Sequence, residues 1–212
     1  MNKSIAIEDI REKYKNRQPG YVSQRRFFAV LLPVIEVEGA LHLLYEVRAR
    51  NLDAQPGEIC FPGGRQEEEE DFLTCALRET QEEIGIPAEK IEIIGEGDTF
   101  VSAPEYLIKT YVGLLKCGEE DISINEEVEE VFTVPLSYFL DNQPDYYQVT
   151  LDPVIPADFP YDAIEQNPDY KWHQGRYGVY IYHIPGRSLW GITAKLTKHF
   201  VDDLTGKAGP TK

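Results

Sequence analysis

The stretch GRQEEEEDFLTCALRETQEEIGI, residues 64 to 86, determines how the rest of this chain is interpreted. Within it, apolar and small side chains recur at the three- and four-residue spacing of a helix that buries one face. These side chains are Leu73, Ala76, Leu77, Thr80 and Ile84. Gly85 and Pro87 follow them and predict where the helix ends.

Three carboxylates, Glu79, Glu82 and Glu83, lie close to that end and share a second helix face. Like charges at this spacing cost roughly 0.2–0.5 kcal/mol per pair, and negative charge there opposes the helix dipole. Most glutamate runs are solvated surface, and residues 67–69 fit that interpretation. The three later glutamates are better explained by a divalent cation, because Mg²⁺ and Mn²⁺ take oxygen ligands.

The same stretch resembles the Nudix box, the signature of hydrolases that cut a nucleoside diphosphate linked to another group. Thr80 departs from the aliphatic residue that is usual at its position. The pattern is G-x5-E-x7-R-E-T-x-E-E-x-G-I, and the matching residues are Gly64, Glu70, Arg78, Glu79, Glu82, Glu83, Gly85 and Ile86.

The resemblance implies a role for each matching position. Mg²⁺ or Mn²⁺ would be held by Glu79, Glu82, Glu83 and the Gly63 carbonyl. The three glutamates would also be the catalytic residues, with Glu82 favoured as the base over Glu126 or Glu127 of a later loop. Structural roles fall to Gly64, Glu70, Arg78 and Gly85.

Residues 44–64, LYEVRARNLDAQPGEICFPGG, are similar to an additional motif of coenzyme A pyrophosphatases. Segments 126–140 and 189–200 also resemble that subgroup. The subgroup implies that Arg48 contacts a phosphate and that Phe61 lies at the substrate site, although Arg48 could also be a surface residue. Asp53 and Glu46 depart from the motif by placing anions where a basic residue and a threonine are usual.

The function expected from these similarities is metal-dependent hydrolysis of coenzyme A or its derivatives, giving 3′,5′-ADP and 4′-phosphopantetheine. An alternative is a Nudix pyrophosphatase for ADP-ribose, NADH or a dinucleoside polyphosphate. A non-catalytic nucleotide-binding module and an acidic interaction protein are further alternatives. The four histidines show no metal-ligand spacing and receive no role; they are His42, His173, His183 and His199.

Periodicity predicts strands and helices in mixed order, which fits an α/β or α+β layered domain. The resemblance narrows this to a Nudix-type α/β/α sandwich with a mixed β-sheet. Expected strands are 27–37, 41–47, 59–61, 91–94, 107–115, 128–134 and 176–184, and expected helices are 4–17, the box and 189–204. We divide the chain into an N-terminal helix and lead-in (1–25), one domain (26–205) and a C-terminal tail (206–212).

Composition limits the partners. The chain has 212 residues and a net charge of -16, which argues against nucleic acid or an anionic membrane as a main partner. No segment has the apolar length of a membrane span or of a signal peptide. Three cysteines without metal-site spacing suggest reduced thiols and a cytoplasmic location. The resemblance also suggests a possible homodimer.

Overall fold

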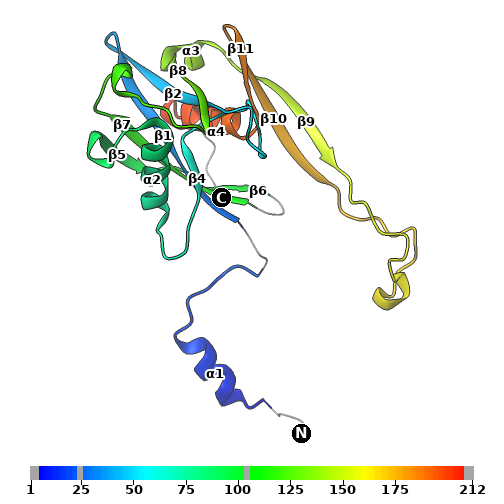
Figure 1. The fold of residues 1–212 in the computed structure, drawn as a ribbon. Coiled ribbons are helices and arrows are strands. Elements are labelled where there is room, and N and C mark those ends of the chain that lie inside the picture. Colours follow the sequence, from blue (N-terminus) through cyan, green and yellow to red (C-terminus); the bar gives the residue numbers. More distant parts are fainter. Residues whose placement is uncertain (1–4, 23–25, 103–105, 208–212) are drawn as a thin grey trace.

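A mixed β-sheet lies between two helices, the box helix at residues 72–84 and the closing helix at residues 191–204 (Figure 1). The computed structural model describes residues 5–22, 26–102 and 106–207. The helices are α1 (Ile7–Lys15), α2 (Phe72–Ile84), α3 (Leu136–Asp141) and α4 (Gly191–Leu204). The strands are β1 (Arg26–Val37), β2 (Ala40–Arg48), β3 (Ile59–Cys60), β4 (Gly63–Arg65), β5 (Ile91–Glu96), β6 (Phe100–Ser102), β7 (Tyr106–Leu115), β8 (Val128–Pro135), β9 (Asp145–Leu151), β10 (Gly175–Ile184) and β11 (Arg187–Trp190).

The larger sheet is built around one parallel strand pair. Residues 26–35 of β1 run parallel to residues 106–115 of β7, and the other pairings in this sheet are antiparallel. Its main order is β3-β2-β1-β7-β5, with β4 on β1, β6 on β7 and β8 on β2. A second sheet has the order β11-β10-β9.

Both faces of the larger sheet are covered, which confirms the expected α/β/α sandwich. Successive residues of a strand point to opposite faces. Leu31 and Leu44 therefore pack in the cluster that contains Ala76 and Ile84 of α2. Their neighbours Leu32 and Tyr45 belong to the other cluster, with side chains of α4.

Polar contacts tie α4 to the sheet. The Thr193 hydroxyl donates to the Ile59 carbonyl at 2.9 Å. The hydroxyls of Tyr45 and Thr197 lie 2.9 Å apart and are buried. Since a buried hydroxyl without a partner is costly, these bonds also fix the position of α4 along the strands.

Some predicted boundaries were wrong. No strand was expected at residues 63–65, yet they form β4 on β1, because glycine allows close backbone approach there. The closing helix begins at Gly191 rather than residue 189, which belongs to β11. Strand β9 is not among the expected strands, and its mostly exposed residues give no alternating pattern. The short β6 was also missed.

Two parts of the chain extend from the sandwich (Figure 1). The helix expected at residues 4–17 is present as the shorter α1, residue 4 lies outside the described residues, and none of the residues of α1 is buried. Strands β9 and β10 form a long antiparallel ribbon. Within the described residues, no helix combines the length and apolar character needed to cross a membrane.

The end of α2 generates a stability prediction. Gly85 has φ +72°, and a Cβ there would lie 2.8 Å from the Ser123 carbonyl oxygen. We expect Gly85→Ala to lower the free energy of unfolding by more than the roughly 1–2 kcal/mol that a left-handed backbone alone costs. Urea denaturation measures this loss.

Gly39→Ala is the matched control. Gly39 also has a positive φ, +80°, but a Cβ there would meet nothing within 4 Å. Gly39→Ala should therefore lower the free energy of unfolding only by the roughly 1–2 kcal/mol that the left-handed backbone costs. Equal losses in the two variants would show that the contact with Ser123 does not constrain the end of α2.

Candidate active site

Helix α2 presents the box glutamates at a fixed place because both of its ends are well defined. Asp71 caps the first turn, where its carboxylate accepts from the Thr74 backbone N–H at 2.9 Å. Gly85 closes the last turn in the left-handed conformation. The unusual Thr80 is fully buried and donates to the Ala76 carbonyl, so its hydroxyl is satisfied within the helix.

Glu83 connects α2 to β4 (Gly63–Arg65), which we call the glycine strand. Its carboxylate accepts from the Gly63 backbone N–H at 2.8 Å, and the residue is only 3% exposed. Burial, reinforced by the charge of Glu46, raises the pKa of Glu83 well above its ordinary range. A buried carboxyl next to further carboxylates is costly unless a cation or a proton compensates it.

The two glycines before the box leave no room for side chains. A Cβ on Gly63 would lie 2.3 Å from the Ala29 carbonyl oxygen of β1. A Cβ on Gly64 would lie 2.3 Å from the Glu79 carboxyl carbon. The Gly63–Gly64 backbone thus fills the narrow space between β1 and the glutamates of α2.

Arg78 lies among the carboxylates and contacts three of them. Its Nε and Nη2 donate to the two oxygens of Glu70 at 2.8 and 3.1 Å. Its Nη1 lies 2.9 Å from Glu79 and 3.0 Å from Glu82. The hydrogen bond from Arg78 is the main cause of the lowered pKa of Glu70. Arg78 therefore joins the loop before α2 to the helix and orients Glu79 and Glu82.

The three box glutamates lie three and four residues apart on α2, but their side chains differ in exposure. Glu83 is buried, the Glu79 side chain is 17% exposed, and the Glu82 side chain is 54% exposed. Burial raises the pKa of Glu79. In the described part of the chain, these carboxylates do not form a group whose oxygens all lie within 4.8 Å. Mutual repulsion and the contacts to Arg78 are consistent with that spread.

Glu46 is a site residue that the sequence did not reveal as such. It lies on β2 with no exposed surface, and burial raises its pKa to about 7. The Cys60 thiol donates to its Oε1 at 3.1 Å, while Oε2 has no hydrogen-bond partner. Its period-two relation to Leu44 could have identified it, since that spacing directs both side chains toward the layer of α2.

The two predicted substrate contacts are placed differently. Arg48 ends β2, is partly exposed, and its charge acts on both Glu46 and Glu83. Its Nε also donates to the Ala54 carbonyl at 3.3 Å. Phe61 is 3% exposed and stacks on Tyr45 in the core, so the structure does not bring its ring to the acidic group.

A later loop is attached to the end of α2. The Ser123 N–H donates to the Ile84 carbonyl at 3.0 Å, and the Asn125 N–H donates to the Glu83 carbonyl at 3.2 Å. These bonds satisfy carbonyls at the C-terminal end of α2. They also hold Glu127 where its charge acts on Glu46 and Glu79.

Comparisons with known proteins identify the family of this chain. A family model described as NUDIX domain matches residues 25–156. The peroxisomal coenzyme A diphosphatase NUDT7 of Mus musculus is 35% identical over 147 residues, which are 67% of this chain and 61% of the mouse protein. The chain therefore spans less than two thirds of that relative. The Nudix hydrolase NudL of Photorhabdus laumondii is 30% identical over 172 residues, or 81% of each chain.

Among solved structures, an Ap4A hydrolase of C. elegans superposes with a TM-score of 0.46 at 19% identity, over 55% of this chain and 84% of that one. The family match covers more than half of the chain, and it contains the glycine strand, the box helix and Glu46. The chain belongs to the Nudix hydrolase family.

Proposed function

We propose that this protein is a metal-dependent pyrophosphohydrolase whose substrate is coenzyme A or one of its derivatives. The observation that carries the proposal is the meeting of Glu79 and Glu83 with the Gly63–Gly64 strand. The name of the mouse relative and the similarity of residues 44–64 support the choice of substrate.

The residues present fit a divalent cation. Glu46 has a buried oxygen without a partner, and Glu83 is a buried acid beside it. Glu79 and Glu127 add carboxylates, while Arg78 is already engaged by Glu70. Such an excess of oxygen donors suits Mg²⁺ or Mn²⁺. Glu79, Glu82, Glu83 and the Gly63 carbonyl would hold the ion.

When bound, such an ion neutralises phosphate charge and lowers the pKa of a water molecule. The residues of the chain then have separate tasks. Glu83 and Glu79 are held in place by the Gly63 N–H and by Arg78. Glu82, the most exposed of the three, is our candidate to take the proton from the attacking water. Arg48 would contact a substrate phosphate from the end of β2.

Mutation of the box glutamates tests the proposed mechanism. We expect Glu79→Gln and Glu83→Gln to reduce turnover by roughly 100-fold or more, because each removes a charge that stabilises the reacting phosphate through the metal site. Steady-state product formation measures this effect, and thermal unfolding checks that the fold remains. Glu68→Gln, a change of an exposed glutamate before the helix, is the control. Normal turnover in both box variants would rule out this assignment.

Product analysis tests the substrate. The protein is incubated with Mg²⁺ or Mn²⁺ and coenzyme A, dephospho-coenzyme A, ADP-ribose or NADH, and the products are separated by chromatography. We expect 3′,5′-ADP from coenzyme A. Cleavage of ADP-ribose or NADH instead would support the proposed hydrolase activity but rule out coenzyme A as the substrate. No cleavage with either metal would favour the binding-module alternative.

Arg48 provides a sharper substrate test. If its guanidinium contacts a phosphate, Arg48→Ala should raise the KM for coenzyme A by roughly tenfold, the loss of about 1.4 kcal/mol that removal of one charge-assisted hydrogen bond produces. Arg50→Ala is the control, since Arg50 pairs with the exposed Glu129. An unchanged KM in Arg48→Ala would show that Arg48 does not bind the substrate and only holds the loop through its hydrogen bond to the Ala54 carbonyl.

The buried acids generate a pH prediction. The pKa of Glu46 is about 7 in the folded protein, above its ordinary value of 4.5. Folding therefore favours the protonated form, and this contribution to stability is complete below pH 4.5 and is lost as the pH rises through about 7. In a buffer that contains a metal chelator, Glu46→Gln should reduce the fall in Tm between pH 5 and pH 8, whereas Glu68→Gln should not. Identical Tm profiles for Glu46→Gln and the wild type would contradict the assignment.

A further inference from the structure

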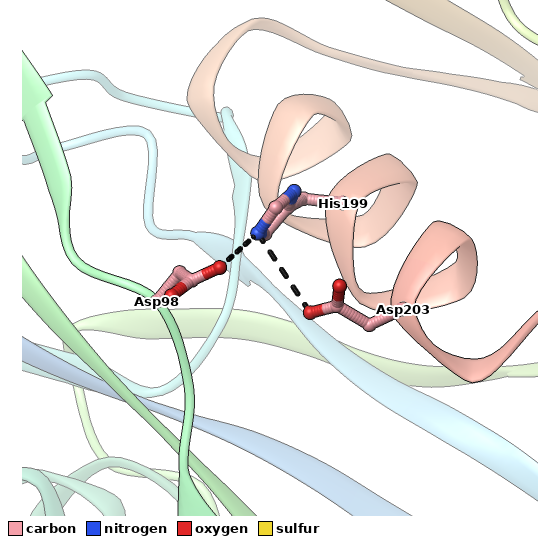
Figure 2. A group of neighbouring side chains, drawn as sticks. All are labelled: Asp98, His199 and Asp203. Carbon is pink, nitrogen blue, oxygen red and sulfur yellow. Dashed lines mark hydrogen bonds and ion pairs between the residues drawn. The ribbon is translucent and has the colours of Figure 1, made fainter. Parts of the chain in front are cut away.

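A histidine and two aspartates meet near the C-terminal end of α4, apart from the box. His199 Nε2 lies 2.6 Å from Asp98 Oδ2 and 3.7 Å from Asp203 Oδ2. The three donor atoms all lie within 4.8 Å of one another. Figure 2 shows both carboxylates directed toward the same ring nitrogen. Spacing along the chain could not reveal this group, because Asp98 is 101 residues from His199.

The sheet and helix α4 hold Asp98, His199 and Asp203 in place. The Gly97 N–H donates to the Thr110 carbonyl at 2.8 Å, and the Thr110 hydroxyl donates to the Asp98 carbonyl at 2.9 Å. Thr110 is a buried residue of β7, so the position of Asp98 is set by the sheet. His199 and Asp203 are four residues apart on α4, which places them on one helix face.

A simple ion pair accounts for only part of this arrangement. One carboxylate, Asp98, is already a sufficient partner for this imidazole nitrogen. Asp203 brings a second anion close to the first, and like charges at such distances disfavour one another. The neighbouring Asp202 is already paired with Lys198. A dication between Asp98 and Asp203 would remove their repulsion and use the ring nitrogen as a third ligand.

The group also borders an open space. Asp98 and His199 line a cavity of about 320 Å³ between α4, the β5–β6 connection and β10. Phe100, Tyr180 and Lys195 form other parts of its wall. Three protein ligands leave coordination positions open, and this cavity has room for water or a small ligand to occupy them.

We propose that Asp98, His199 and Asp203 form a binding site for a divalent transition-metal ion, with Zn²⁺ preferred. The imidazole nitrogen favours Zn²⁺, whereas Mg²⁺ takes oxygen ligands and is slow to lose its water. The site uses no box residue, and α4 covers the face of the sheet opposite to α2. It therefore stands independently of the proposed hydrolysis.

Equilibrium dialysis of the full chain against Zn²⁺ in a large excess of Mg²⁺ tests the proposal, with bound zinc measured by atomic absorption. Magnesium occupies sites made of oxygen ligands alone. We expect the wild type to bind one Zn²⁺ per chain. His199→Ala and the near-isosteric Asp203→Asn should each weaken binding by at least about tenfold, since even indirect partners of a metal cost that much.

Two controls separate this site from the other acidic groups. His183→Ala removes a histidine that, within the described residues, has one carboxylate partner, Asp145 at 2.8 Å, and this variant should keep the zinc. Glu79→Gln alters the box and should also keep the zinc. Circular dichroism checks the fold of every variant, and visible absorption of the Co²⁺ form provides a second readout that should be lost in His199→Ala.

Three results would overturn the proposal. The first is a wild-type chain that binds no Zn²⁺ under these conditions. The second is full zinc binding by both folded variants, His199→Ala and Asp203→Asn. The third is loss of the zinc in Glu79→Gln, which would place the ion at the box.

Discussion

The hydrogen bond from the Gly63 N–H to the Glu83 carboxylate is the contact on which the rest of the site depends. It joins β4, a strand paired with β1, to α2, which packs against one face of the sheet. A side chain at Gly63 or Gly64 would collide with β1 or with Glu79. Backbone without a Cβ is therefore what allows carboxylates to approach the strand, and the acidic residues of α2 take their positions from it.

This closeness has an electrostatic cost that the structure meets only in part. Glu46 and Glu83 are both buried, burial raises the pKa of each, and the charge of Glu46 raises the pKa of Glu83 further. Arg78 offsets the charge of Glu70, Glu79 and Glu82, but no contact between Arg78 and the two buried acids is present among the described residues. A protein selected for stability alone would place apolar side chains here. The retained acids fit a site that is completed by a cation.

Much of the fold follows from local pattern. The periodicity of β1, β2 and α2 reflects burial against the sheet, so these elements could be predicted closely from the sequence. Strands β6, β9 and β11 could not, because they are short or exposed and depend on partners elsewhere in the chain. In the site, the spacing of the glutamates predicted their grouping on α2. The period-two relation of Glu46 to Leu44 could have placed Glu46 on the α2 side of the sheet, whereas the His199 group needed the fold, since Asp98 is 101 residues from His199.

The parallel pairing of β1 with β7 has a consequence for how the chain folds. Residues 26–35 pair with residues 106–115, and everything from the β2 hairpin to the end of α2 lies in the segment between them. Such a closure is entropically costly and slow compared with the local β1–β2 hairpin. During synthesis, the hairpin can form early, whereas the central pairing must wait until β7 has left the ribosome. The core cluster that joins Ala76 and Ile84 of α2 to Tyr111 and Leu115 of β7 can therefore be completed only after β7 has been made.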